Sequence, residues 1–194
     1  LNKAKKLDYY RNLHYHDNNK RLPFEDCTFE YVYSNSAYWV KSLENHISDL
    51  FRITKPGGHI ILELKTRDAI TLSVSAQLCS LLGKESCDIL DAGRASTWEG
   101  LCNQLEYESI FSKNSDVEII KKEPIYGDIL LQMWDVGLRP LFRPLVRLAN
   151  CVDLETRLES KKEICDTIYK ISKELIENYR PEENKCIEWI YVLK

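Results

Sequence analysis

The alternation of apolar and polar positions along the chain is most regular between Leu22 and Lys65. Within this stretch, Phe29–Tyr33 is aromatic and β-branched and too short for a helix, so it predicts a buried strand. Ser42 is a plausible N-cap for a following helix, with Asn45 at its third position. The apolar stripe of that helix consists of Leu43, Ile47, Leu50, Phe51 and Ile53, which recur at helical spacing.

The KPGG sequence at Lys55–Gly58 marks the end of this helix. Pro56 cannot continue a helix, and the two glycines allow the backbone angles of a tight loop. His59–Leu64 is then mostly apolar, as a strand covered by helices on both faces requires. Because two strands joined by one covering helix run parallel, residues 22–65 predict a single βαβ unit.

The same reading predicts further elements on both sides of this unit. The other expected strands are Leu13–His16, Val117–Ile120 and Cys186–Leu193. The other expected helices are Ala69–Leu82, closed by Gly83; Trp98–Phe111, N-capped by Thr97; and Asp153–Tyr179, whose apolar face includes Leu154, Leu158 and Ile171. The expected irregular parts are a loop at Gly93–Ser96 and a partly helical segment at Ile125–Asn150, with Pro140 and Pro144 at helix starts. Strands that alternate with helices predict an α/β domain.

Length, charge and cysteine usage narrow the class of protein. The chain has 194 residues, enough for one domain with its own core, so residues 1–194 are expected to form a single domain. The net charge of −3 gives no sign of a surface that binds nucleic acid. The apolar runs are far shorter than the ~20 residues of a membrane span, and no signal peptide is visible. Seven cysteines without CxxC spacing favour a reduced, cytoplasmic setting over disulfides or a zinc site.

The stretch from Leu22, with LPFED at its start and KPGG before its second strand, resembles the second half of class I S-adenosylmethionine-dependent methyltransferases. In that family the sheet order is three, two, one, four, five, seven, six, and the last strand is antiparallel. The resemblance maps strands three to seven onto Leu13–His16, Phe29–Tyr33, His59–Leu64, Val117–Ile120 and Cys186–Leu193. The implied fold class is α/β: a partial Rossmann-like methyltransferase sheet of strands three to seven, with a helical insert, residues 125–180, before the last strand.

The resemblance also implies that the cofactor site is incomplete. The glycine-rich loop and the ribose-binding acid of the family belong to strands one and two, and neither occurs here. The chain begins at Leu1, in mid-pattern, so we expect it to be the C-terminal part of a methyltransferase that is inactive alone. The parent enzyme would transfer a methyl group from S-adenosylmethionine to a small-molecule acceptor, which requires mainly alignment. The alternative is a non-catalytic, methyltransferase-like interaction protein that binds a partner through the insert.

Two polar stretches are candidates for contact with S-adenosylmethionine. Asp17 follows the position of strand three, where the family carries an acid that binds the adenine amino group, and Asn18 adjoins it. The alternative is an ordinary turn, which Asp and Asn favour. Ser34, Asn35 and Ser36 lie where the family places residues that face the cofactor, although small polar residues also simply end strands.

The candidates for contact with the acceptor are Tyr38, Trp39, Trp134 and Arg139. Tyr38 and Trp39 follow the expected strand Phe29–Tyr33 and could equally belong to the core. Within the insert, Asp135, Arg139 and Arg143 could orient an anionic acceptor, because arginine suits bidentate carboxylate binding; surface ion pairing is the alternative. No catalytic base is identified, and the sequence leaves the acceptor and the oligomeric state open.

The histidines do not indicate a metal site. His14 and His16 share one face of an extended segment beside Asp17, but no third ligand is identifiable, so no metal is expected. His46 is expected to be exposed on its helix, and His59 is expected to be structural.

Overall fold

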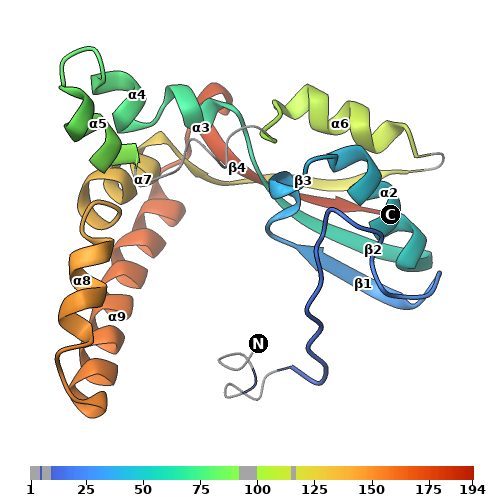
Figure 1. The fold of residues 1–194 in the computed structure, drawn as a ribbon. Helices are drawn as coiled ribbons and strands as arrows, with labels where there is room; N and C mark the ends of the chain where they lie inside the picture. The colour runs from blue at the N-terminus through green and yellow to red at the C-terminus, as the bar shows by residue number, and fades with distance from the viewer. Residues whose placement is uncertain (1–4, 6–9, 92–99, 115–116) are drawn as a thin grey trace.

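The computed structural model describes residues 5, 10–91, 100–114 and 117–194 (Figure 1). These residues form a four-stranded mixed sheet in the order β1-β2-β4-β3. The strands are β1 (Phe29–Ser34), β2 (Thr54–Lys65), β3 (Ile119–Gly127) and β4 (Cys186–Leu193). The α/β class is therefore confirmed, and the observed order corresponds to four, five, seven and six of the predicted sheet.

Strand direction also agrees with the prediction. β1 pairs with β2 in parallel, with Val32 opposite Ile60, and α2 (Leu43–Ile53) connects them. β4 is antiparallel to both of its neighbours, so β1, β2 and β3 all point the same way. Their carboxyl ends therefore meet at one edge of the sheet.

Helices cover one face of this sheet. α2 and α6 (Gln104–Ser112) lie on that face (Figure 1). Their buried side chains share one core with Ile60, Leu62, Leu64 and their neighbours in β4. The other face is less covered: Tyr31 is 67% exposed and Tyr33 is 58% exposed. The expectation that helices cover the sheet on both faces is therefore wrong at β1 for the described residues.

The first half of the chain follows local signals closely. Ser42 caps α2, since its hydroxyl accepts a hydrogen bond from the Asn45 N–H at 3.4 Å. β2 begins at Thr54, earlier than predicted, and its pairing with β1 jumps from Thr54 to His59 across the KPGG turn. Gly57 has a φ of 78° in this turn, and a Cβ on Gly58 would lie 2.7 Å from the Glu30 carbonyl oxygen.

Leu13–His16 is extended but not a strand, which corrects the prediction. A strand requires a neighbour that takes up its backbone N–H and C=O groups. Among the described residues none pairs with this segment, and β1 is the edge strand on that side of the sheet.

Two predicted helices have different bounds. Ala69–Leu82 is divided into α3 (Asp68–Thr71) and α4 (Val74–Leu78), because Ser73 is extended (ψ 145°) and its hydroxyl accepts from the Ala76 N–H. The helix predicted from Trp98 begins at Gln104, where Asn103 and Glu106 form a capping box. The predicted cap Thr97, the helix start at Trp98 and the loop at 93–96 lie outside the described residues.

β3 is longer than the predicted Val117–Ile120 and continues through charged residues. The Lys122 ammonium nitrogen lies over the Trp189 ring, 4.9 Å from its centroid, and donates a hydrogen bond to the Glu108 carboxylate at 2.8 Å. A long charged side chain can thus continue a strand that borders solvent.

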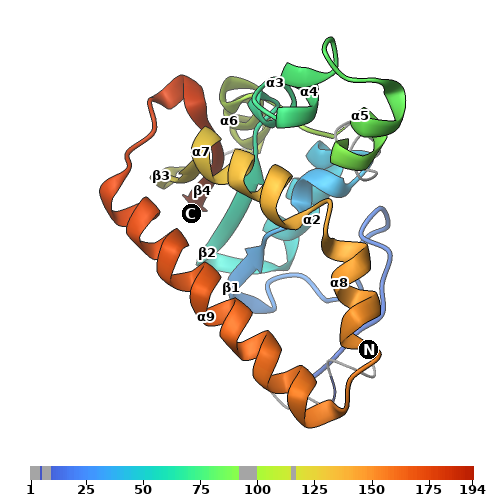
Figure 2. The same ribbon diagram turned by 90° about the vertical axis from the view of Figure 1, so that its left-hand side faces the viewer.

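The insert is more regular than predicted. It contains α7 (Asp128–Met133), a π-helical turn η3 (Trp134–Leu138), α8 (Phe142–Ala149) and α9 (Leu154–Asn178), and a short 3-10 helix η4 (Glu183–Lys185) leads into β4. Pro144 lies in the first turn of α8, as its missing N–H permits, whereas Pro140 precedes the helix. α8 and α9 project from the carboxyl edge of the sheet as a helical pair (Figures 1 and 2).

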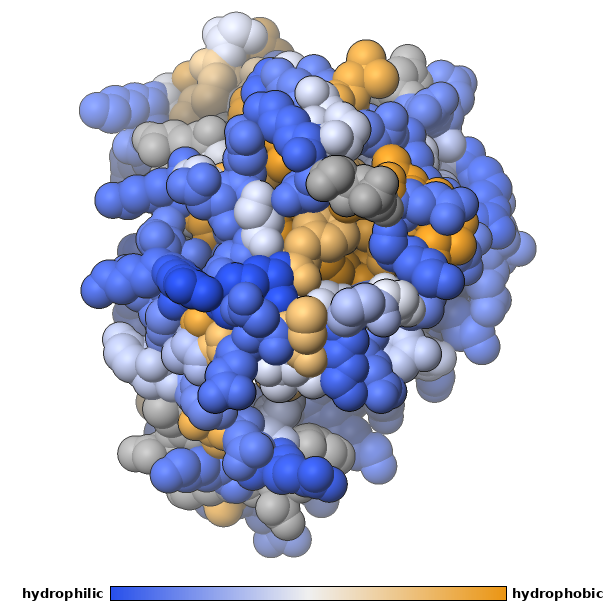
Figure 3. Space-filling model, turned by 90° about the vertical axis from the view of Figure 1, so that its right-hand side faces the viewer, coloured by the Kyte–Doolittle hydropathy of each residue, from blue (hydrophilic) through white to orange (hydrophobic). Residues whose placement is uncertain are grey.

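α9 matches the predicted range, but its apolar face is not buried. Leu154 is 66% exposed and Leu158 is 58% exposed, so these two apolar side chains face solvent. The end of the sheet opposite the insert, where the C-terminus lies, is mainly hydrophilic with a smaller hydrophobic area (Figure 3). Among the described helices, none is long and apolar enough to cross a membrane.

Candidate functional site

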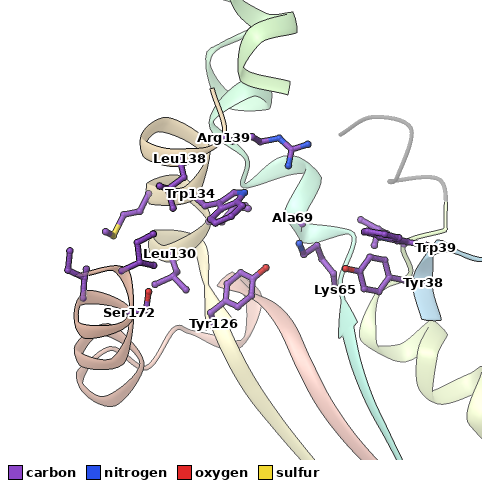
Figure 4. Close-up of a pocket in the computed structure, with 15 residues that line it drawn as sticks. Tyr38, Trp39, Lys65, Ala69, Tyr126, Leu130, Trp134, Leu138, Arg139 and Ser172 are labelled. Atoms are coloured by element: carbon purple, nitrogen blue, oxygen red, sulfur yellow. The ribbon is translucent and has the colours of Figure 1, made fainter. Parts of the chain in front are cut away.

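A cavity of about 700 Å³ lies at the carboxyl edge of the sheet, between the sheet and the insert. Its walls come from the ends of β2 and β3, from the turn after β1, and from α7, η3 and α9 (Figure 4). The lining residues are Tyr38, Trp39, Lys65, Ala69, Leu101, Tyr126, Leu130, Leu131, Met133, Trp134, Leu138, Arg139, Ile168, Ile171 and Ser172.

Tyr38 and Trp39 reach the cavity from η1 (Ala37–Trp39), a single turn directly after β1. Tyr38 is almost fully buried, and burial, assisted by the charge of Glu188, raises its pKa to about 12. Its hydroxyl therefore stays protonated and can donate a hydrogen bond. Gly100 allows this turn to pack closely, since a Cβ there would lie 2.3 Å from the Tyr38 carbonyl oxygen.

Lys65 ends β2 and brings a positive charge to the cavity. Its backbone is held in place because its carbonyl oxygen accepts a hydrogen bond from the Tyr107 hydroxyl at 2.7 Å. Its Nζ lies 4.0 Å from a carboxylate oxygen of Glu188 and 5.9 Å from the centroid of the Tyr126 ring. Lys65 and Tyr126 are lining residues that the sequence analysis missed, although both stand at the carboxyl ends of strands.

Trp134, Leu138 and Arg139 come from η3 and the residue after it. The Arg139 Nε donates a hydrogen bond to the Asp91 carbonyl oxygen at 3.0 Å. Burial lowers the pKa of Arg139, and the nearby Asp91 opposes that effect. In Figure 4 the Trp134 ring and the Arg139 guanidinium extend from the insert toward the side that carries Lys65 and Tyr38.

All four residues expected at the acceptor, Tyr38, Trp39, Trp134 and Arg139, thus line one cavity. Asp135 and Arg143 do not. Asp135 is 1% exposed and its carboxylate accepts a hydrogen bond from the Val74 N–H at 3.1 Å, so it faces α4 rather than the cavity. Arg143 is exposed on α8.

The five residues expected at the cofactor do not line this cavity. Asp17 Oδ1 accepts hydrogen bonds from both the backbone and the side-chain N–H of Asn19, each at 3.0 Å, and the first of these is the main cause of its lowered pKa. Asn18 lines a separate cavity beside Ser42 and His46. Ser34 is paired with Leu62, and Asn35 and Ser36 connect β1 to η1.

These residues make up only part of what S-adenosylmethionine needs. Asp17 and Asn18 offer polar groups, but the 194 residues include no glycine-rich loop to hold the methionine end. Among the described residues, the outer edge of β1 has no neighbouring strand that could carry one. The described chain alone therefore does not fit the whole cofactor.

No group of three or more metal-binding side chains occurs within the described ranges. His46 is buried, which corrects the expectation that it is exposed. His59 stacks on Tyr31 with ring centroids 5.4 Å apart, in agreement with a structural role.

Comparison with known proteins finds a family match in the amino-terminal third of the chain. Residues 1–62 match the family model described as "Methyltransferase domain". A 50-residue stretch is 34% identical to malonyl-[acyl-carrier protein] O-methyltransferase of Erwinia billingiae and covers 25% of this chain and 20% of that protein. The resemblance of this part to class I S-adenosylmethionine-dependent methyltransferases is thereby confirmed. The match spans only a fifth of the length of this curated relative.

Solved structures of methyltransferases are similar over more of the chain. A putative sarcosine dimethylglycine methyltransferase from Galdieria sulphuraria is 14% identical, with a TM-score of 0.49, over 99% of this chain and 62% of that one. Phosphoethanolamine N-methyltransferase 2 of Haemonchus contortus, solved with S-adenosyl-L-methionine, is 20% identical, with a TM-score of 0.44, over 91% of this chain and 35% of that one.

Proposed function

We propose that this chain forms the acceptor-binding part of an S-adenosylmethionine-dependent methyltransferase that acts on a small molecule, and that the acceptor binds in the cavity between sheet and insert. One observation carries the proposal. The residues expected at the acceptor lie in two segments about a hundred positions apart, and they line a single cavity. That cavity lies at the carboxyl ends of β1, β2 and β3, the edge where open α/β sheets bind ligands.

The cavity has the size and surface of a small-molecule site. Its volume of about 700 Å³ lies within the usual range for such sites, and its walls are mostly apolar with a few polar groups. The three similar proteins named above, a malonyl-[acyl-carrier protein] O-methyltransferase, a phosphoethanolamine N-methyltransferase and a putative sarcosine dimethylglycine methyltransferase, differ in the acceptor that their names give. The acceptor of this chain is therefore inferred from the cavity rather than from any of these names.

The described side chains would bind and orient the acceptor. Trp134 and Trp39 offer aromatic surface, and Tyr38 offers a hydroxyl that stays protonated at neutral pH. Holding an acceptor in one orientation can supply much of the rate enhancement of a group transfer. S-adenosylmethionine would supply the methyl group.

We further propose that the cofactor site is completed by residues outside these 194, with Asp17 and Asn18 on the adenine side and Ser34–Ser36 facing the cofactor and the incoming acceptor. Among the described residues the outer edge of β1 is unpaired, which supports this, since a parallel strand there would extend the sheet. Titration calorimetry of the 194-residue chain should then detect only weak binding of S-adenosylmethionine. Micromolar binding by this chain would contradict the proposal for the cofactor site.

Methyl transfer itself is tested with the full-length protein that contains this chain. Incubation with methyl-labelled S-adenosylmethionine and a small-molecule extract should give labelled low-molecular-weight products. A Trp39→Ala variant should give less product, whereas Tyr169→Ala, which removes an exposed ring from α9 outside the cavity, should not. Absence of labelled product from a protein that binds the cofactor would refute the proposed function.

A further inference from the structure

Among the described residues that line it, the cavity contains positive charge and no negative charge. Of the 15 lining residues, Lys65 and Arg139 are cationic, none is acidic, and most of the others are apolar or aromatic. The charge of −3 on the whole chain makes this local excess of positive charge a property of the site rather than of the composition.

The two cations come from different walls. Lys65 ends a sheet strand and Arg139 follows η3 in the insert, and Figure 4 shows both extending toward the space between these two walls. Each has a fixed anchor outside the cavity lining: Nζ of Lys65 lies 4.0 Å from Glu188, and Nε of Arg139 donates to the Asp91 carbonyl oxygen. These anchors hold both cations in place at the rim of an apolar space.

Glu188 and Asp91 offset part of this charge, but neither lines the cavity. A ligand anion inside the cavity would therefore face two cationic side chains among its described lining residues. Because walls of low polarity focus the field between charges in a cleft, the attraction between such charges is stronger than it would be on an open surface.

We propose that the ligand of this cavity is a carboxylate on an apolar or aromatic body, with the carboxylate between Arg139 and Lys65 and the body against Trp134 and the aliphatic wall. Arginine favours a carboxylate because its planar guanidinium donates two parallel hydrogen bonds to the two oxygens. The inference rests on the proposed function only in taking this ligand as the methyl acceptor.

The test uses a matched pair of probes, 2-naphthoate and its uncharged amide, 2-naphthamide. Titration calorimetry on the 194-residue chain should show naphthoate binding about tenfold more tightly, since hydrogen bonds to charged groups contribute more than neutral ones. Raising the salt concentration should weaken the binding of naphthoate more than that of the amide.

Variants then locate the carboxylate. Arg139→Gln and Lys65→Met should each lower the affinity for naphthoate about tenfold and leave the affinity for naphthamide nearly unchanged. Arg139→Lys should retain part of the preference because it keeps the charge. Arg143→Gln, on the exposed surface of α8, is the matched control and should change neither affinity. Circular dichroism checks that each variant remains folded.

Three results would overturn the inference: equal affinity for the two probes, no binding of naphthoate, or variants that lower the affinity for both probes equally. The outcome is separable from that of the proposed function. A preference for naphthoate in a protein that transfers no methyl group would leave the anion site standing and refute the methyltransferase. Methyl transfer to an uncharged acceptor, without a preference for naphthoate, would support the methyltransferase and refute the anion site.

Discussion

The carboxylate of Asp135 accepts a hydrogen bond from the backbone N–H of Val74 at 3.1 Å, which joins the insert to the segment after β2. Val74 is the first residue of α4, so the carboxylate also lies at a helix N-terminus, where negative charge is favourable. This buried contact holds η3, and with it Trp134 and Arg139, against the rest of the cavity wall.

Replacing Asp135 should therefore loosen the insert. Asp135→Ala leaves a buried N–H without its acceptor and should lower the free energy of unfolding by about 1–3 kcal/mol. Asp135→Asn, whose amide oxygen can still accept, should cost less. Urea denaturation measures both, with Asp166→Ala on the exposed surface of α9 as the control. Equal, negligible losses in all three variants would mean that this contact does not hold the insert.

Gly100 should be intolerant of a side chain. A Cβ at this position would lie 2.3 Å from the Tyr38 carbonyl oxygen, so Gly100→Ala must displace the turn that carries Tyr38. Displacement of tightly packed backbone costs about 1–3 kcal/mol. Gly137→Ala is the matched control: nothing lies within 4 Å of its added Cβ, and alanine is the better residue in a helical turn. Melting temperatures should fall for the first variant and hold or rise for the second.

The free energy of unfolding should decrease as the solution becomes acidic, in part because of His46. Burial lowers the pKa of His46 below its usual 6.5, although Asp49 and the backbone of Asn18 act in the opposite direction. The unfolded chain therefore binds more protons than the folded chain in the range below about 6.5, and each pH decrease through this range favours unfolding. The stabilising effect is fully present above pH 6.5 and is lost toward the folded-state pKa.

His46→Gln should remove this contribution. Urea midpoints for the wild type and the variant, measured at pH 7.5 and pH 5.5, give the effect of the substitution on the pH dependence. The difference between the two pH values should be smaller for the variant than for the wild type. An identical pH dependence in both proteins would show that His46 does not contribute.

Local signals account for the parts of the fold that could be predicted from the sequence. Ser42 with Asn45 and the apolar run of β4 each act over a few neighbouring residues, and each was found where expected. The KPGG sequence does follow the end of α2, but it lies within β2, at the irregularity in its pairing with β1, rather than in a separate loop. The capping box of Asn103 and Glu106 is an equally local signal that the prediction overlooked, which misplaced the start of α6.

The errors arose where a distant neighbour decides the outcome. Leu13–His16 has strand-like residues, but an extended segment becomes a strand only beside a partner. The apolar stripe of α9 correctly predicted the helix, yet no sequence pattern states what will cover it. Lys65 was overlooked at the site for the same reason, since its role depends on the insert that folds over the end of β2.

Asp17 tests the cofactor side of the proposed site. In the full-length protein, Asp17→Ala and Asn35→Ala should weaken binding of S-adenosylmethionine, because each removes a polar group expected to contact it. Asp17 also bonds Asn19 within its own turn, so the melting temperature of each variant must be measured beside its affinity. Reduced stability with unchanged affinity would return Asp17 to the role of an ordinary turn residue.

Trp134 tests the acceptor side. Its indole extends into the cavity from η3 and is expected to cover the body of the acceptor (Figure 4). In the full-length enzyme, Trp134→Ala should therefore raise the KM for the acceptor or lower kcat, with a loss in kcat/KM of about tenfold or more, since a buried aromatic contact contributes about 1–3 kcal/mol. Binding of S-adenosylmethionine should remain nearly unchanged, because its expected contacts at Asp17, Asn18 and Ser34–Ser36 lie outside this cavity.

The matched control is Tyr169→Ala, which removes an exposed aromatic ring from α9 and should leave both acceptor kinetics and cofactor binding intact. Loss of cofactor binding with unaltered acceptor kinetics would refute the assignment of the insert. A parallel loss of both, with a lower melting temperature, would mean that Trp134 serves the packing of the insert rather than the acceptor.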